Sequence, residues 1–229
     1  MQRTMILTVF IAIAMSSSGL VAQNLQRLSS DEIEGRQVRG IDLNQVTTVN
    51  AVTRTLNAAH VPGGIVTITT CGVEQSHDLT PLGPTLRDAL DSIVVADPQY
   101  RWYLDQGVVN FVPSNNEPTL LDVVIANFKV ERGKTQDDIV RELLALPEIG
   151  EGITRLQLSQ GFTEIGIRSL ARPGFSQGEE NKGFALHLRN TTVREALNAV
   201  ARAHGSAAWS YQEKRCNGPK EFSIRFLAW

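Results

Sequence analysis

The sequence predicts an α+β fold that consists of two tandem repeats of a small helix–strand and helix–hairpin sandwich. Two observations lead to this prediction. A stretch of twenty residues that begins at Thr85 aligns without a gap with a stretch that begins at Thr192, and both have the pattern of a helix followed by a hairpin strand. Internal similarity of this kind indicates a repeated structural unit rather than shared composition.

The two stretches, TLRDALDSIVVADPQYRWYL and TVREALNAVARAHGSAAWSY, are identical at six positions. The opening threonine precedes an acidic residue by three positions, which is the spacing of a capping box at a helix N-terminus. The shared leucine belongs to an apolar stripe of helical period, which we expect to be buried. The shared tryptophan lies in the strand, where we expect it to pack the hairpin onto its helix rather than to bind a ligand. The residues that define the repeat are Thr85, Leu90, Trp102, Thr192, Leu197 and Trp209.

The other elements follow in a similar order in both halves. Before the first repeated stretch we expect a helix, a Gly-Gly turn at 63–64 and a strand over 65–70. Before the second we expect a helix that Thr135 caps and that buries Leu146, and then a strand, FALHL. The hairpins are YRWYL and VVNFV around the turn DQG, and AAWSY and EFSIRF around the longer tip QEKRCNGPK.

The chain divides into four segments on these patterns. Residues 1–23 form a signal peptide, and residues 24–40 form a polar lead-in with one short helix capped by Ser30. Residues 41–114 form the first α+β module and residues 115–229 the second, with the boundary in the polar stretch SNNEP. A long loop over Pro173–Gly183 interrupts the second module.

The first 23 residues, MQRTMILTVFIAIAMSSSGLVAQ, have the layout of a secretory signal peptide: a positive charge at Arg3, an apolar run, and small residues up to Ala22. The alternative is a membrane anchor, but the run is shorter than the ~20 apolar residues that a spanning helix needs. No later stretch is apolar enough to span a bilayer. We therefore expect an exported, periplasmic or secreted protein with no membrane span after cleavage of the signal.

Export places the two cysteines, Cys71 and Cys216, in an oxidising compartment. They either form a disulfide or remain two separate thiols, and the sequence leaves both possibilities open. There is no CxxC motif and no cluster of cysteine and histidine. The sequence therefore predicts neither a redox motif nor a zinc site.

Charge and motifs exclude several classes of function. The net charge is -2 and the basic residues are scattered singly, so we expect no nucleic-acid partner. The four histidines lack metal-ligand spacing, and neither a GxSxG, a P-loop nor a GxGxxG motif is present. The sequence predicts no catalytic residue, no cofactor and no metal site.

The helix TLRDALDSIV with the hairpin YRWYLDQGVVNFVP resembles the short N-terminal (STN-type) domain of secretins and TonB-dependent receptors, and TVREALNAVARAHGSAAWSY is similar. The resemblance covers about forty residues per copy, without the pore or barrel domain of those proteins. It implies a non-catalytic docking module that binds an envelope protein, for example by adding a strand to a hairpin edge. One alternative is a small-ligand or peptide-binding protein that uses the cleft between the modules, with the loop over Pro173–Gly183 as a lid. A hydrolase with an unrecognised site is the third.

Overall fold

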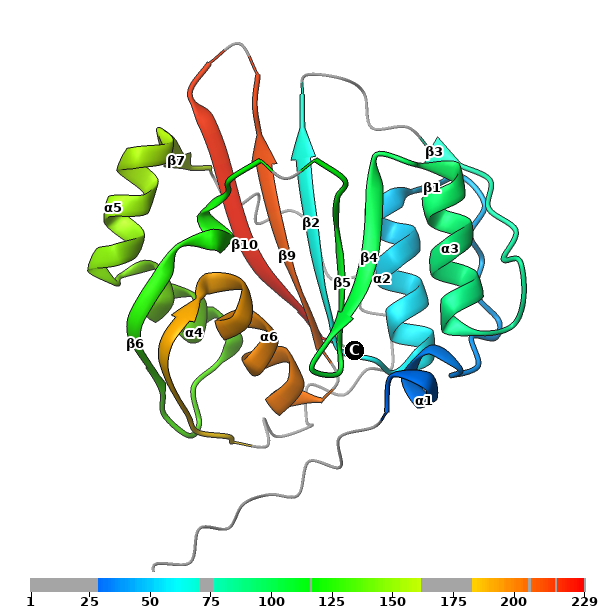
Figure 1. Ribbon diagram of the computed structural model, residues 1–229, viewed down its shortest axis with the longest axis horizontal. Helices are drawn as coiled ribbons and strands as arrows, with labels where there is room; N and C mark the ends of the chain where they lie inside the picture. Colours follow the sequence, from blue (N-terminus) through cyan, green and yellow to red (C-terminus); the bar gives the residue numbers. More distant parts are fainter. Residues whose placement is uncertain are drawn as a thin grey trace, which may run out of the picture.

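The computed structural model describes residues 29–70, 76–115, 117–161, 183–205, 207–216 and 218–228. It shows an α+β protein in which helices flank a mixed six-stranded sheet (Figure 1). The predicted signal peptide, Cys71 and nearly all of the predicted lid loop lie outside the described residues. We call residues 41–114 the first unit and residues 115–229 the second unit.

The first unit follows a short helix in the lead-in, α1 (Ser30–Glu34). That helix begins one residue earlier than expected for a cap at Ser30, because the Ser29 hydroxyl accepts from the backbone N–H of Glu32. The elements of the first unit are β1 (Val46–Thr47), α2 (Thr48–Ala59), β2 (Gly63–Thr69), β3 (Ser76–His77), α3 (Leu86–Ala96), β4 (Tyr100–Asp105) and β5 (Val108–Pro113).

The second unit begins with a short 3-10 helix and then follows a comparable order. Where one helix was expected after Thr135 there are two, because Pro147 cannot continue the first and instead begins the second, for which Leu146 is the N-cap. The elements are η1 (Leu120–Asp122), β6 (Val124–Val130), α4 (Gln136–Leu144), α5 (Pro147–Leu156), β7 (Leu158–Gln160), β8 (Leu186–Thr192), α6 (Val193–His204), β9 (Ala207–Lys214) and β10 (Lys220–Ala228).

The central sheet has the strand order β4-β5-β2-β9-β10-β7, so each unit contributes three adjacent strands. Within each unit the hairpin strand in the middle, β5 or β10, pairs parallel with an earlier strand of the same unit, β2 or β7. Two further antiparallel pairs, β1-β3 and β6-β8, also correspond in order. The structure shows that the two units have corresponding strand orders. Their origin as repeats of one unit stays a prediction.

The two units join through seven residue pairs between the parallel strands β2 and β9, from Gly63 and Ala208 to Thr69 and Lys214. Because β2 is parallel to both β5 and β9, while β10 is antiparallel to β9, the strands β5 and β10 run in opposite directions. The second unit is therefore turned over relative to the first. Its helices cover the opposite face of the shared sheet.

The core accordingly has two parts, one on each face. On the α6 face, Trp209 and Tyr211 pack with residues of α4, α5 and α6. On the α2–α3 face, Ile65, Phe111 and Ala208 pack with residues of α2 and α3. The central strand β2 is buried on both faces over its first five residues, since each face has its own helical cover.

The Gly-Gly pair was expected to form a turn, but Gly63 and Gly64 are the first residues of β2. Gly64 pairs directly with Trp209, and a Cβ on Gly64 would overlap the indole ring. A Cβ on Gly63 would overlap the side chain of Leu56 in α2. The glycines are therefore needed for close packing on the two faces of the sheet rather than for a turn.

Both hairpins form, with one difference in length. In the first, Gln106 and Gly107 have φ of 48° and 85°, as a two-residue type I′ turn requires. In the second, the strands extend further into the expected tip, which is limited to residues 215–219. Lys214 at the end of β9 and Glu221 near the start of β10 line the pocket described next.

Candidate functional site

Strands β9 and β10 each have one polar face, which follows from the order of their side chains in the sequence. In β9, Ser210, Gln212 and Lys214 alternate with residues that are buried on the α6 face. In β10, Glu221, Ser223 and Arg225 alternate with Phe222, Ile224 and Phe226, which pack on the α6 face. Side chains of a strand point alternately to opposite faces, so the polar residues share the α2–α3 face.

On that face the register aligns the polar side chains into three rows across β2, β9 and β10. The cross-strand partners in successive rows are Thr69, Lys214 and Glu221; Thr67, Gln212 and Ser223; and Ile65, Ser210 and Arg225. Ile65 is buried among residues of α2 and α3, whereas Thr69, Gln212, Lys214 and Glu221 are exposed. The first two rows and Arg225 form the floor of a pocket of about 660 Å³, which we call the inter-unit pocket.

The wall of the inter-unit pocket comes from the first unit. Thr48, in the first turn of α2, donates its hydroxyl hydrogen to Asp97 Oδ2 at 2.6 Å and so ties the start of α2 to the end of α3. Tyr100, at the start of β4, stacks on Phe111 with ring centroids 5.2 Å apart. His77 of β3 completes this side of the wall. Residues that are far apart in sequence thus surround a polar floor.

The charges that line the pocket are balanced in sign. Lys214 and Arg225 are cationic, and Asp97 and Glu221 are anionic. Within the described ranges, no three His, Cys, Asp or Glu side chains come together so as to hold a metal ion. Hydroxyl, amide and ionic groups dominate the floor, which suits a polar ligand that makes several hydrogen bonds.

One group in the pocket has an unmet hydrogen-bond requirement. The Nε of Arg225 is buried, and it has no hydrogen-bond partner among the described residues. Leaving a buried donor unpaired costs about 1–3 kcal/mol, and more if the group is charged. Buried side-chain atoms without a partner are uncommon in proteins, which distinguishes Arg225 from the other charged residues of the pocket.

On the α6 face, directly behind the floor, β9 carries a buried carboxylate. Glu213 accepts a hydrogen bond from the Tyr211 hydroxyl at 2.5 Å and from Nε of Arg215 at 2.7 Å. Burial raises the pKa of the Glu213 carboxyl. Arg215 also forms an ion pair with Glu117 in the link between the units, so this network fixes the end of β9 that carries Lys214.

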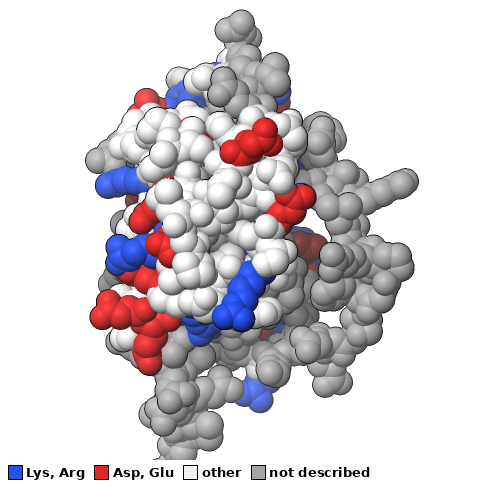
Figure 2. Space-filling model, turned by 90° about the vertical axis from the view of Figure 1, so that its right-hand side faces the viewer, with Lys and Arg blue, Asp and Glu red and all other residues white. Residues whose placement is uncertain are grey.

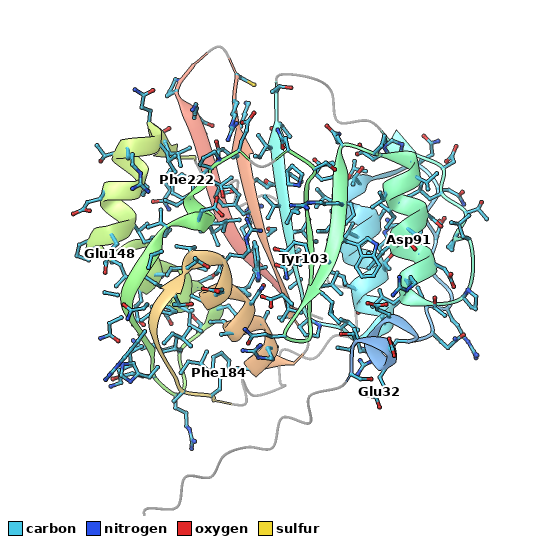
Figure 3. All side chains as sticks on the ribbon, in the orientation of Figure 1. Glu32, Asp91, Tyr103, Glu148, Phe184 and Phe222 are labelled. Carbon is cyan, nitrogen blue, oxygen red and sulfur yellow. The ribbon has the colours of Figure 1, made fainter. Side chains whose placement is uncertain are left out.

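The residues that the sequence singled out lie away from the inter-unit pocket. Both threonines act as N-caps in complete capping boxes, and both leucines are buried in the helix faces. Each tryptophan donates its Nε1 hydrogen to a side chain of its own helix at 2.8 Å: Trp102 to Asp91, and Trp209 to Asn198. Figure 3 shows Asp91 on α3. The expectation that the tryptophans pack each hairpin onto its helix is confirmed.

Of the two cysteines, Cys216 lies in the tip of the second hairpin and is disulfide-bonded. The sequence has one other cysteine, Cys71, which lies outside the described residues. The pairing of Cys71 with Cys216 stays a prediction.

Sequence inspection missed the pocket residues of β9 and β10. The signal for them was present, since polar and apolar residues alternate through SYQ and EFSIRF. Alternation alone identifies a polar strand face, and most such faces are simply exposed to water. That this face is enclosed by the ends of α2 and α3 depends on the pairing of β2 with β9, for which the sequence carries no local signal.

A second surface of interest is the edge of the sheet at β4. Among the described residues this strand pairs only with β5, and Trp102–Asp105 have a strand partner on one side only. Tyr103 projects from it with about a third of its surface exposed (36%) (Figure 3). Figure 2, which views the side of α3, shows a broad area without charged side chains, and the exposed Leu82 and Val95 belong to α3 and the loop before it.

Among the residues that the structure describes, no helix combines the length and the apolar character that crossing a bilayer requires. Comparisons of the chain with protein-family models, with curated proteins and with solved structures give no significant match. Function is therefore inferred from the chemistry of the inter-unit pocket and of the sheet edge.

Proposed function

We propose that this protein is an exported, non-catalytic binding protein that holds a small polar ligand or short peptide in the inter-unit pocket. The observation that carries the proposal is the floor of polar side chains in register across β2, β9 and β10, walled by the ends of α2 and α3. Concave sites at the junction of two structural units are common ligand sites, and a few placed polar groups give them specificity.

A ligand in this position would contact both units at once. Thr67 and Asp97 belong to the first unit, and Gln212 and Ser223 belong to the second. Binding would therefore stabilise the junction as well as the pocket, because a ligand that binds only the folded state raises the free energy of unfolding. The expected signature is a rise in melting temperature that depends on ligand concentration.

The test is an NMR titration of the ¹⁵N-labelled protein with a panel of polar metabolites and short peptides. We expect at least one member to shift the amide signals of residues 210–214 and 221–225. The double variant Gln212→Ala/Ser223→Ala should weaken that binding about tenfold, whereas Lys129→Ala, a change of an exposed side chain on β6, should leave it unchanged. A panel that shifts no pocket signal at millimolar concentration would contradict the proposal.

A second candidate function is docking of an envelope protein at the β4 edge, which the resemblance to STN-type modules also favours. The supporting observation is that Trp102–Asp105 of β4 pair with β5 alone among the described strands. Strand addition uses the backbone groups of such an edge. A partner bound in this way should slow hydrogen exchange of amides in residues 100–105, and Tyr103→Lys should weaken the complex more than Tyr103→Phe. Unchanged exchange in β4 within a stable complex would exclude this mode of docking.

A further inference from the structure

We propose that Arg225 binds the carboxylate of the ligand in the inter-unit pocket, and that the ligand is a short peptide or a similarly extended polar acid. This inference rests on the proposed function and specifies its ligand. Its basis is that Arg225 lines the inter-unit pocket, while no ion pair among the described residues includes its guanidinium.

No carboxylate of the described part of the chain compensates Arg225. None of the ion pairs formed there includes Arg225. Glu221 lies on the same strand and face but four residues away, about 13 Å at ~3.3 Å per residue. Asp97 already accepts the hydroxyl hydrogen of Thr48. The neighbour of Arg225 in its own row is Ser210, which is neutral.

The chemistry of the guanidinium selects the kind of group that fits. Its two terminal nitrogens form a planar pair of donors, which a carboxylate accepts with two parallel hydrogen bonds. A neutral carbonyl would accept one of these hydrogens but would leave the positive charge uncompensated in a partly buried position. A ligand with a carboxylate therefore gains more from this position than a neutral ligand of the same shape.

The remaining charges favour a carboxylate over a phosphate. Asp97 and Glu221 line the same pocket as Arg225 and Lys214. A phosphate monoester carries between one and two negative charges near pH 7 and would be repelled by both acidic side chains. A carboxylate carries one charge, which Arg225 alone balances.

The length of the floor sets the expected size of the ligand. From the row of Arg225 to the row of Lys214 and Glu221 the sheet extends about 13 Å, the length of roughly four residues of extended chain. Between these rows lie Gln212 and Ser223, whose side chains can donate to and accept from peptide groups. An extended chain of about four residues, with its terminal carboxylate at Arg225, would match both the charge and the hydrogen-bonding groups.

The experiment compares N-acetyl-tetraalanine with its C-terminal amide in NMR titrations of the full chain. These probes differ only in the terminal charge. We expect the wild-type protein to bind the acid at least tenfold more tightly than the amide. Arg225→Gln should abolish this preference and Arg225→Lys should retain part of it. Lys214→Gln, which removes an equal charge from an exposed position of the same pocket, should retain most of it.

The outcomes separate this inference from the proposed function. Equal binding of the acid and the amide by the wild type, or an acid preference that persists in Arg225→Gln, would overturn the role of Arg225 while leaving the pocket as a binding site. Inorganic phosphate that competes as well as the acid would overturn the choice of a carboxylate. A tetrapeptide that shifts no pocket signal would overturn the peptide assignment, and the wider panel decides the proposed function. Melting temperatures of the variants within a few degrees of the wild type verify that each has folded.

Discussion

Trp102 and Trp209 occupy matching positions in the two units and yet lie in different surroundings. Each donates its Nε1 hydrogen to the side chain eleven residues earlier, on the helix that precedes its strand. Trp209 is fully buried in the middle of the sheet. Trp102 lies on the edge strand β4, is only partly buried, and has the guanidinium of Arg87 5.8 Å from its ring centre. The same local design therefore serves a core position in one unit and an edge position in the other.

The residues that accept the two tryptophan hydrogens also differ: one is charged and lies near the edge, and the other is neutral and lies in the core. Near the edge the acceptor is Asp91, whose charge can remain in contact with water. In the core it is Asn198, which is neutral and whose amide also donates to Asn110 Oδ1 at 3.2 Å. A buried charge without a partner is far more costly than a buried amide that is hydrogen-bonded on both sides. The comparison shows that position in the assembled sheet determines which polar residue can accept the tryptophan hydrogen.

The largest expected effect concerns the covalent link between the units. We expect this link to be a disulfide between Cys71 and Cys216, the two cysteines of the sequence. A disulfide there closes a loop of about 145 residues and would stabilise the protein by roughly 5 kcal/mol in the chain-entropy model. We expect reduction, or the variant Cys71→Ser/Cys216→Ser, to lower the denaturant midpoint markedly. Free thiols in a peptide map of the oxidised protein would contradict the pairing.

The tryptophans themselves give the next test. We expect Trp209→Ala to destabilise the protein by about 3–5 kcal/mol, because it leaves a large cavity against Gly64 and an unpaired acceptor on Asn198. Trp102→Ala should cost about 1–2 kcal/mol, since its side chain is only partly removed from water. Equilibrium unfolding in urea measures both values. Equal losses for the two variants would show that the edge and core positions are energetically alike.

Exchanging the acceptors sharpens the comparison further. Asn198→Asp should destabilise the protein by about 3 kcal/mol at pH 7, because it buries a charge that faces the carbonyl oxygen of Asn110. Burial raises the pKa of such a carboxyl in the folded state above its unfolded value, so the loss should diminish as the pH falls through that raised pKa. Asp91→Asn, the matched variant near the edge, should change stability by less than about 0.5 kcal/mol. A pH-independent loss in Asn198→Asp would contradict this reasoning.

The smallest expected effect is the loss of a helix cap, which should cost the same stability in both units. Thr85 and Thr192 each cap a helix through a hydroxyl that accepts from a backbone N–H at 3.2 Å, and we expect Thr→Ala at either position to cost about 1 kcal/mol. Thermal unfolding of the two variants at neutral pH measures this cost. Unequal values would show that the neighbouring structure, rather than the cap, dominates at one of the two helices.

The capping boxes also predict a shared acid dependence. Hydrogen bonds from the side chain and backbone of Thr85 hold the pKa of Asp88 below its usual range, and the backbone N–H of Thr192 does the same for the pKa of Glu195. A lowered folded-state pKa gives stability that is present above the unfolded pKa of about 4 and is lost as the pH falls towards the folded value. Asp88→Asn and Glu195→Gln should each flatten the loss of stability in this pH range. If both variants lose stability at acid pH as the wild type does, other carboxylates determine that loss.

Much of the local structure could be predicted from particular residues. The caps at Thr85, Thr135 and Thr192 and the turn at Gln106 and Gly107 depend on hydrogen bonds or dihedral angles within a few residues, which sequence spacing specifies directly. The apolar stripes of α3 and α6 likewise identify their buried faces. Predictions were wrong where distant packing decides: Gly63 and Gly64 belong to a strand because Leu56 and Trp209 need the space, and no turn signal reveals this.

The sequence by itself determined that this protein is an α+β chain with two similar helix–hairpin units, since period, caps and internal similarity are local properties. Only the tertiary structure decided that β2 pairs with β9 and that the second unit is turned over relative to the first. This pairing brings Thr67, Gln212 and Ser223 into one row and leaves their face open beside α2 and α3. The physical reason is that strand pairing uses backbone hydrogen bonds, which are the same for nearly every residue type. The site that binds ligand in our proposal therefore follows from long-range pairing that no local sequence pattern specifies.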